Sequence, residues 1–196
     1  MTASPSVIVM AGPNGAGKST AAPALLRGRL AVPHFVNADE IARGLSAFAP
    51  ETMAMAAGRI MLARLKELAK ARVDFAFETT LASHSFAPWF RSLAVDGYEF
   101  HLVFLCLPSS DLAVARVADR VRQGGHHVPD DVVHRRWAAG LRNFWHLYRP
   151  LTTSWHVYDN SKKNRLRQVA LGSGLTVARV KRPASWRRFQ AQAEGA

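Results

Sequence analysis

The sequence predicts an α/β protein in which a parallel sheet is covered by helices on both faces and carries a small helical lid. Short apolar runs alternate with helical patterns along most of the 196 residues, an order typical of parallel sheets with crossover helices. The second observation is the segment 12–19, Gly-Pro-Asn-Gly-Ala-Gly-Lys-Ser, which fits the phosphate-binding pattern G-x-x-x-x-G-K-[S/T] at every position. The apolar run 7–10 before it indicates a buried strand, and the residues from 19 onward indicate a helix start.

The pattern in 12–19 predicts a P-loop NTPase that binds a nucleoside triphosphate. Its glycines let backbone N–H groups point at phosphate oxygens, and the helix that follows adds the positive end of its dipole. We expect Lys18 to reach the β- and γ-phosphates and the Ser19 hydroxyl to hold Mg²⁺. The nucleotide-binding residues predicted from this segment are Gly12, Pro13, Asn14, Gly15, Ala16, Gly17, Lys18, Ser19 and Thr20.

The other elements follow in order along the chain. Strands are predicted over residues 34–36, 74–78, 98–107 and 155–158, with a sixth over 175–180. Helices are predicted over residues 19–27, 52–71, 85–94, from the cap Ser109 to the glycines at 124–125, from about 129 onward, and over 183–192. Two helices carry apolar stripes, formed by Met55, Ile60, Leu65 and Leu68 in 52–71 and by Val114, Val117, Ala118 and Val121 in the helix after Ser109.

Ligands of such sheets bind beyond the carboxyl ends of the strands, where this chain places two acidic residues. Asp39 follows the strand after the loop helix, and we expect it to act as the general base; the alternative is a helix N-cap. Glu78 ends an apolar strand and is expected to hold Mg²⁺ through water or to bind the acceptor, with the Thr80 hydroxyl beside it. The alternative for Glu78 is an ion pair with a lid arginine.

The segment Gly124-Gly125-His126-His127 lies between two predicted helices and indicates the hinge of a lid over about residues 116–136. Arg116 and Arg120, four residues apart on one helix face, are candidates to neutralise charge on the transferred phosphoryl group. The alternative for Arg116 is a helical pair with Asp119. The other lid candidates for closing on phosphate are His126, His127, Arg122, Arg135 and Arg136. His126, His127 and His134 have no acidic or thiol partner at zinc-ligand spacing.

Composition is that of a soluble globular enzyme with one domain and a formal net charge of +12. The final segment, about 162–196, is a basic C-terminal extension that carries nine of the 26 lysines and arginines. A solvated surface explains it better than nucleic-acid binding, because no RNA-binding signature accompanies it. The one cysteine, Cys106, lies in an apolar run and is expected to be a buried, inert thiol. With neither a membrane span nor a secretory signal in view, a cytoplasmic location is expected.

The ordered set of motifs resembles the zeta toxin family of P-loop kinases over roughly residues 7–161. It consists of the P-loop, Asn37-Ala38-Asp39, Phe77-Glu78-Thr79-Thr80, the arginine helix and Tyr158-Asp159-Asn160-Ser161. The resemblance implies ATP and Mg²⁺ as cofactors, Asn160 in the ATP site, a small-molecule acceptor, a strand order of 2-3-1-4-5, and phosphorylation of UDP-N-acetylglucosamine. It implies Asp39 as the base, Glu78 and Thr80 as substrate contacts, and Arg116 as a phosphate contact. The segment 124–127 stands where these toxins carry a lid arginine, and nothing in the sequence supports an antitoxin partner.

Two other functions remain open. A polynucleotide or nucleoside kinase is favoured by the basic surface alone, and its binding would weaken strongly with salt. A non-kinase ATPase module is the other alternative, since Gly12 to Thr20 also occurs in transporter-type cassettes. Those cassettes need a serine-glycine-glycine signature, which residues 171–175 do not fit.

Overall fold

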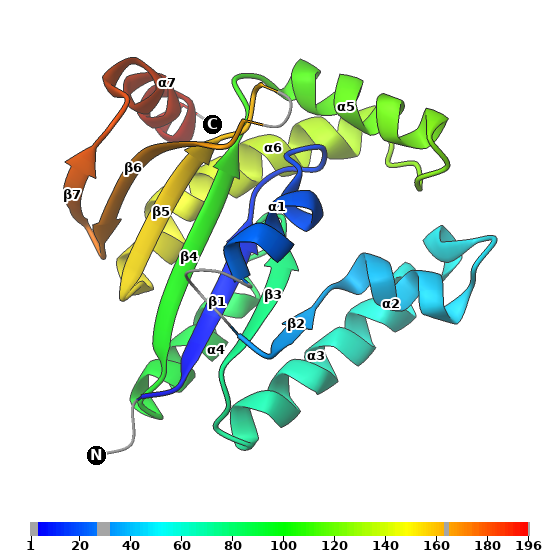
Figure 1. Ribbon diagram of the computed structural model, residues 1–196, viewed down its shortest axis with the longest axis horizontal. Helices are drawn as coiled ribbons and strands as arrows, with labels where there is room; N and C mark the ends of the chain where they lie inside the picture. Colours follow the sequence, from blue (N-terminus) through cyan, green and yellow to red (C-terminus); the bar gives the residue numbers. More distant parts are fainter. Residues whose placement is uncertain (1–3, 27–31, 163–164, 196) are drawn as a thin grey trace.

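A seven-stranded sheet in the order β2-β3-β1-β4-β5-β6-β7 forms the centre of the protein, seen in a computed structural model that describes residues 4–26, 32–162 and 165–195 (Figure 1). Its strands are β1 (Ser6–Ala11), β2 (His34–Val36), β3 (Phe75–Thr79), β4 (Glu99–Cys106), β5 (Ser154–Asp159), β6 (Arg167–Ser173) and β7 (Thr176–Val180). The first five pair in parallel, in the order that the family resemblance implies. Strands β6 and β7 continue the sheet in antiparallel pairing.

Helices cover both faces of the sheet, as predicted. They are α1 (Lys18–Leu26), α2 (Ala38–Leu45), α3 (Ala54–Lys70), α4 (Phe86–Val95), α5 (Ser110–Arg122), α6 (Asp130–Asn143) and α7 (Pro183–Glu194). Three short turns, η1 (Pro50–Met53), η2 (Phe144–Tyr148) and η3 (Arg149–Leu151), join them, and η2 is a π-helix. Helices α1 and α5 pack on one face, and α3, α4 and α7 pack on the other.

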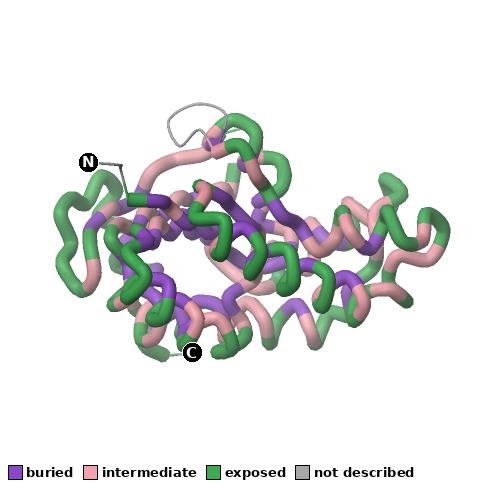
Figure 2. The backbone as a smooth tube through the Cα atoms, turned by 90° about the horizontal axis from the view of Figure 1, so that it is seen from below, coloured by how far each residue is buried: buried purple, intermediate pink, exposed green. Residues whose placement is uncertain are grey.

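Strand β1 shows why the central strands read as unbroken apolar runs. Val7 and Val9 join the core on the side of α3 and α4, whereas Ile8 and Met10 join the core on the side of α1 and α5. All four side chains are at most 3% exposed, since a parallel strand is covered on both faces. Figure 2 shows this buried backbone in the middle of the molecule, with exposed segments around it.

Helix α6 crosses from one face of the sheet to the other. Val133, near its start, packs with α1 and α5, while Leu141, near its end, packs with α4 and α7. Helix α6 therefore connects the two faces, and its middle residues come close to the loops that follow β1 and β3. This crossing was not predicted, and it determines which lid side chains reach the site.

The chain after β5 is more ordered than a basic extension suggests. Strand β6 was not predicted, and the strand predicted over 175–180 pairs with it through a turn in which Gly174 has a φ of +49°. Trp186 of α7 stacks on Trp155 of β5 with ring centroids 5.6 Å apart, and Phe189 is 2% exposed. Lys163 of this segment, like the predicted helix end at Arg27, lies outside the described residues.

Two predicted helix faces were partly wrong. In α3, Met55 is 77% exposed and Ile60 is 44% exposed, and the buried stripe is formed by Ala57, Met61, Leu65 and Leu68. These positions follow the spacing of four and three residues that a helix requires, which Met55 and Ile60 do not. In α5 the buried residues are Ala113 and Val117, whereas Ala118 is exposed.

Two simpler predictions concern Cys106 and the membrane. The Cys106 thiol is buried, and burial, followed by the charge of Asp159, raises its pKa to about 12, which suits an inert core residue. Across the described ranges, every helix is too short or too polar to cross a lipid bilayer.

Candidate active site

The P-loop lies between β1 and α1 and is supported from behind by Asn160, the residue after β5. The Asn160 side-chain amide donates to the carbonyl of Ala16 at 2.8 Å. Gly17 has a φ of +78°, and a Cβ atom there would lie 2.6 Å from Asn160 Nδ2, so only glycine fits this close approach. Asn160, predicted as an ATP-binding residue, thus holds the backbone of the loop in place.

Lys18 begins α1 with its ammonium turned into the loop. Its Nζ donates to the carbonyl of Pro13 at 3.0 Å and lies 3.5 Å from Glu78 Oε1. Burial lowers the pKa of Lys18, and the carboxylates of Glu78 and Asp39 raise it in part. Lys18 is thus a buried cation with one direct carboxylate partner, at the position where the P-loop pattern predicts phosphate contact.

Glu78 joins the P-loop to the loop after β2. Its Oε2 accepts from Ser19 Oγ at 2.7 Å and from Asn37 Nδ2 at 3.0 Å. The alternative of a lid arginine as its partner is wrong, because the cation beside it is Lys18. A hydroxyl and a carboxylate next to a phosphate site are oxygen ligands of the kind that Mg²⁺ takes, so Ser19 and Glu78 fit this ion. Among the described residues, no group of three or more His, Cys, Asp or Glu side chains suits a metal.

Asp39 lies in the first turn of α2, next to the Glu78 cluster. The N-cap of α2 is Asn37, whose Oδ1 accepts from the backbone N–H of Asp39 at 2.8 Å, so the interpretation of Asp39 as a cap is wrong. The half-buried Asp39 carboxylate makes no hydrogen bond or ion pair within the described ranges, and its charge raises the pKa of Lys18 and of His126. An unengaged carboxylate between the loop lysine and the lid is placed to accept a proton.

The two arginines of α5 differ in what they contact. Arg116 donates from Nη2 to the carbonyl of Ser161 at 2.8 Å. The predicted alternative, a pair between Arg116 and Asp119, is wrong, because Asp119 pairs with Arg122. Arg120 donates from Nη2 to the carbonyl of His126 at 3.1 Å, and its buried Nε has no hydrogen-bond partner in the described part of the chain. Its charge also contributes to lowering the pKa of Lys18, after burial, which is the main cause.

Sequence reasoning gave Asn37 no role and named Arg136 only as one of several lid candidates for closing on phosphate. Arg136 of α6 donates from Nη1 to Asn14 Oδ1 of the P-loop at 3.5 Å, and burial, then the charge of Arg135, lowers its pKa. It brings an arginine from the lid side to the loop. Asn37 ties Ser19 to Glu78 and caps α2. An asparagine before a predicted helix is a recognisable cap signal, but only the crossing of α6 reveals Arg136.

Thr80 begins a loop after β3 that is fixed by α6. The Thr80 hydroxyl accepts from the backbone N–H of Ala82 at 3.4 Å, so in this structure it supports its own loop. Asn143 Nδ2 donates to the carbonyl of Leu81 at 2.8 Å, and its Oδ1 lies 2.9 Å from His84 Nε2. Leu81 has a φ of +57°, a conformation that a branched residue keeps only when its surroundings impose it.

We expect Gly140→Ala to displace this loop. A Cβ atom on Gly140 would lie 2.5 Å from the carbonyl oxygen of Thr80, a backbone group that cannot move as a flexible side chain can. The steric conflict should destabilise the protein by about 1–3 kcal/mol, as overpacking in a well-packed interior does. Denaturant unfolding measures this loss, with Gly58→Ala as the control, since a Cβ there meets nothing within 4 Å. Equal stability of the two variants would contradict the close packing of α6 on Thr80.

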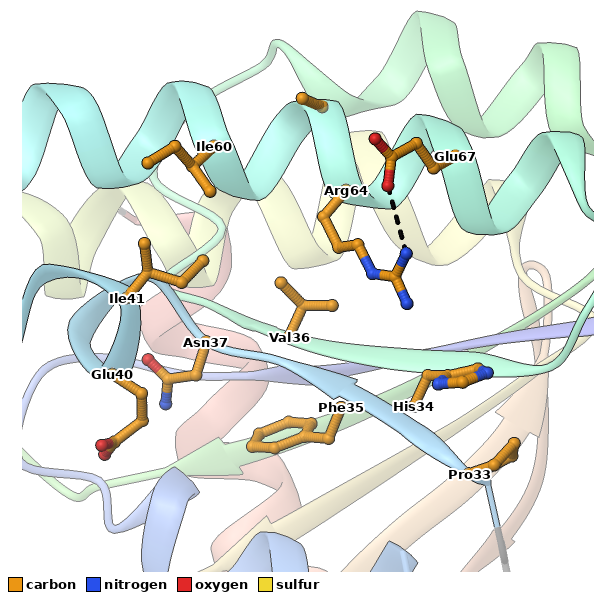
Figure 3. Close-up of a pocket in the computed structure, with 11 residues that line it drawn as sticks. Pro33, His34, Phe35, Val36, Asn37, Glu40, Ile41, Ile60, Arg64 and Glu67 are labelled. Carbon is orange, nitrogen blue, oxygen red and sulfur yellow. Dashed lines mark hydrogen bonds and ion pairs between the residues drawn. The ribbon is translucent and has the colours of Figure 1, made fainter. Parts of the chain in front are cut away.

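A cavity of about 710 Å³ lies between β2, α2 and α3 (Figure 3). Phe35 and Val36 of β2 lie opposite Ile60 of α3, and Arg64 is paired with Glu67 at 3.1 Å on its rim. The cavity meets the site at Asn37, whose amide donates to Glu78. Its volume falls within the range of small-molecule sites, roughly 300–1,000 Å³.

Comparisons with known proteins agree with this geometry. The family model described as AAA domain (AAA_33) matches residues 7–147. A protein of Haemophilus influenzae described as uncharacterized is 29% identical over 132 residues, which cover 66% of this chain and 91% of that protein.

Solved structures share the fold at low sequence identity. The AvrRxo1-ORF1:AvrRxo1-ORF2 complex with sulphate ions matches with a TM-score of 0.72 at 14% identity. The same complex solved with ATP matches with a TM-score of 0.69 at 15% identity. Both matches cover 96% of this chain and 64% of that one, so this chain spans slightly less than two thirds of its length. A chain of the PezAT chromosomal toxin–antitoxin system of Streptococcus pneumoniae has a TM-score of 0.65 at 14% identity, over all of this chain and 80% of that one.

These matches confirm the resemblance on which the fold was predicted. The chain of the toxin–antitoxin system shares the fold of this chain. The family model covers the P-loop, Glu78, the lid over 116–136 and all of α6. The chain therefore belongs to the AAA domain family, and it shares the fold of the AvrRxo1-ORF1:AvrRxo1-ORF2 and PezAT structures.

Proposed function

We propose that this protein is an ATP-dependent phosphotransferase of the zeta toxin type, which transfers the γ-phosphate of ATP to a hydroxyl group of a small molecule. One observation carries the proposal. The P-loop residues Lys18 and Ser19 contact Glu78, and the unengaged carboxylate of Asp39 lies beside them. In a kinase such a carboxylate takes the proton of the acceptor hydroxyl, whereas in a hydrolysing ATPase it would orient water, so the fate of the γ-phosphate distinguishes the two.

Each group then has a role in phosphoryl transfer. Lys18 and the P-loop N–H groups bind the phosphates, and Arg116, Arg120 and Arg136 neutralise charge on the transferred group. Asp39 takes the proton of the acceptor hydroxyl. The hydroxyl oxygen bonds to the γ-phosphorus while the bond between that phosphorus and the ADP oxygen breaks. Mg²⁺, held by Ser19 directly and by Glu78 through water, would screen the phosphate charge. ATP is the donor to test first, since the similar AvrRxo1 complex was solved with ATP.

Transfer of labelled γ-phosphate from ATP to a panel of acceptors tests the proposal. The panel contains UDP-N-acetylglucosamine, other nucleotide-sugars, nucleosides and 5′-hydroxyl oligonucleotides. Label on a nucleotide-sugar supports the zeta-type reaction, and UDP-N-acetylglucosamine is the first candidate because of the resemblance. Label on an oligonucleotide that disappears between about 50 and 200 mM salt supports a polynucleotide kinase instead. Label in inorganic phosphate alone contradicts the transferase.

We place part of the acceptor in the cavity beside β2, because Asn37 and Glu40 line it on either side of Asp39 in sequence. The exposed Ile60 on its wall can be enlarged without disturbing the core. We expect Ile60→Trp to raise the KM for the acceptor several-fold while the KM for ATP stays the same, as measured by steady-state kinetics. Leu62→Trp, an equally exposed residue of α3 outside this cavity, is the control. Equal kinetics of both variants would place the acceptor elsewhere.

A further inference from the structure

The loop between α5 and α6 wraps around Arg120 and carries His126 with it. The backbone N–H of Gly125 donates to the carbonyl of Arg120 at 2.9 Å, and Arg120 Nη2 donates back to the carbonyl of His126 at 3.1 Å. A Cβ atom on Gly125 would lie 2.5 Å from Arg120 Cγ, so this residue packs directly on the arginine stem. These contacts fix the backbone of His126 next to the Arg120 guanidinium.

His126 is half-buried, and the charges of groups from four elements act on it. They are Asp39 of α2, Glu51 of η1, Arg120 of α5 and Arg136 of α6. Burial lowers the pKa of His126, the two carboxylates raise it, and the two arginines lower it. In contrast, the neighbouring His127 is exposed.

Neither Arg120 nor Arg136 makes an ion pair in the described part of the chain, although the charge of Asp39 acts on Arg136. Arg120 Nε is buried without a hydrogen bond, and the contact made by the Arg136 guanidinium is with the neutral amide of Asn14. The carboxylate of Glu78 is already engaged by Lys18 and Ser19. A triphosphate on the P-loop supplies the missing negative charge, and it would favour the protonated form of a histidine beside it.

We propose that His126 is a protonatable clamp for the triphosphate. This inference rests on the proposed function, since it requires ATP on the P-loop. His126 binds a proton from solvent when the triphosphate arrives, and its imidazolium then adds to the charge of Arg120 and Arg136. Nucleotide binding thereby becomes dependent on pH, which an arginine at this position would not allow.

The sign of the pH dependence follows from linkage. In the free protein, the pKa of His126 is held below the ordinary value, and in the complex the triphosphate raises it. Below both pKa values, His126 is charged in both states and the added affinity is fully present. The added affinity is lost as the pH rises through the higher pKa of the complex. Each unit by which binding raises the pKa corresponds to about a tenfold gain in affinity.

The experiment measures the affinity for an ATP analogue with a non-hydrolysable β–γ bridge, with Mg²⁺, from about pH 5 to about pH 8. Because the terminal phosphate also titrates in this range, the wild-type protein is compared with His126→Gln and His126→Arg. We expect the wild type to bind more tightly than His126→Gln at low pH and equally at high pH. His126→Arg should keep the tight binding at high pH. His146→Gln, an exposed histidine of η2, is the control and should behave as the wild type.

A second measurement needs no variant that could misfold. NMR titration of the His126 ring, with and without the analogue, should show a higher pKa in the complex. An unchanged His126 pKa, or the same pH dependence in wild type and His126→Gln, would overturn the clamp while leaving the kinase proposal intact. Failure of the analogue to bind at any pH, to the same degree as in Lys18→Ala, would instead overturn the proposed function.

Discussion

Lys18→Ala should abolish phosphoryl transfer and weaken nucleotide binding. Lys18 is the buried cation of the P-loop, 6% exposed, and alanine would leave the phosphates without its charge. Loss of a single donor to charge that develops in a transition state lowers the rate by about 10²–10³, and a lysine at the phosphates should reach at least this range. Single-turnover transfer from labelled ATP and calorimetric titration with ATP measure the two effects.

The same substitution also has a structural effect that must be separated from catalysis. Without Lys18, the Glu78 carboxylate loses its cation, although Ser19 Oγ and Asn37 Nδ2 still donate to it. The free energy of unfolding should therefore fall by only about 1–3 kcal/mol. Lys70→Ala, at the exposed end of α3, is the control for a lost surface charge. Normal turnover by folded Lys18→Ala protein would remove the P-loop from the reaction.

The parts of this site that could be predicted are those that local sequence determines. The P-loop follows from eight adjacent residues between a strand and a helix. Asp39 follows β2 and Glu78 lies at the carboxyl end of β3, and the carboxyl ends of these parallel strands meet at one edge of the sheet. For such residues, position in the chain and position in space are linked by a simple rule.

The parts that could not be predicted depend on tertiary packing. Arg136 reaches Asn14 because α6 crosses the edge of the sheet, which no periodicity in residues 130–143 indicates. The alternative partner of Arg116 was wrong because Asp119 lies three residues from both Arg116 and Arg122. In the structure Asp119 pairs with Arg122, and Arg116 donates to the carbonyl of Ser161. Strand β6 was missed because its glycine and polar residues resemble a loop. It is held in an extended conformation by its antiparallel pairing with β5.

Asp39→Asn should remove transfer while leaving nucleotide binding nearly intact. The substitution keeps the shape of a side chain that makes no ion pair or hydrogen bond within the described ranges, so little structural change is expected. What is lost is the ability to take the proton of the acceptor hydroxyl. General base catalysis contributes about 10²–10⁴ to the rate, and this is the expected decrease in kcat.

The comparison of Asp39→Asn with Lys18→Ala separates chemistry from binding. Asp39 raises the pKa of Lys18, so its charge contributes to keeping the lysine protonated, but Glu78 contributes more and remains in the variant. ATP affinity should therefore change much less than in Lys18→Ala. Asp96→Asn, at the exposed end of α4, controls for the loss of one negative charge from a protein of net charge +12. If Asp39→Asn turns over normally, Asp39 is not the base. The acceptor hydroxyl would then lose its proton to solvent or to the phosphate itself, as the loose transition state of phosphoryl transfer allows.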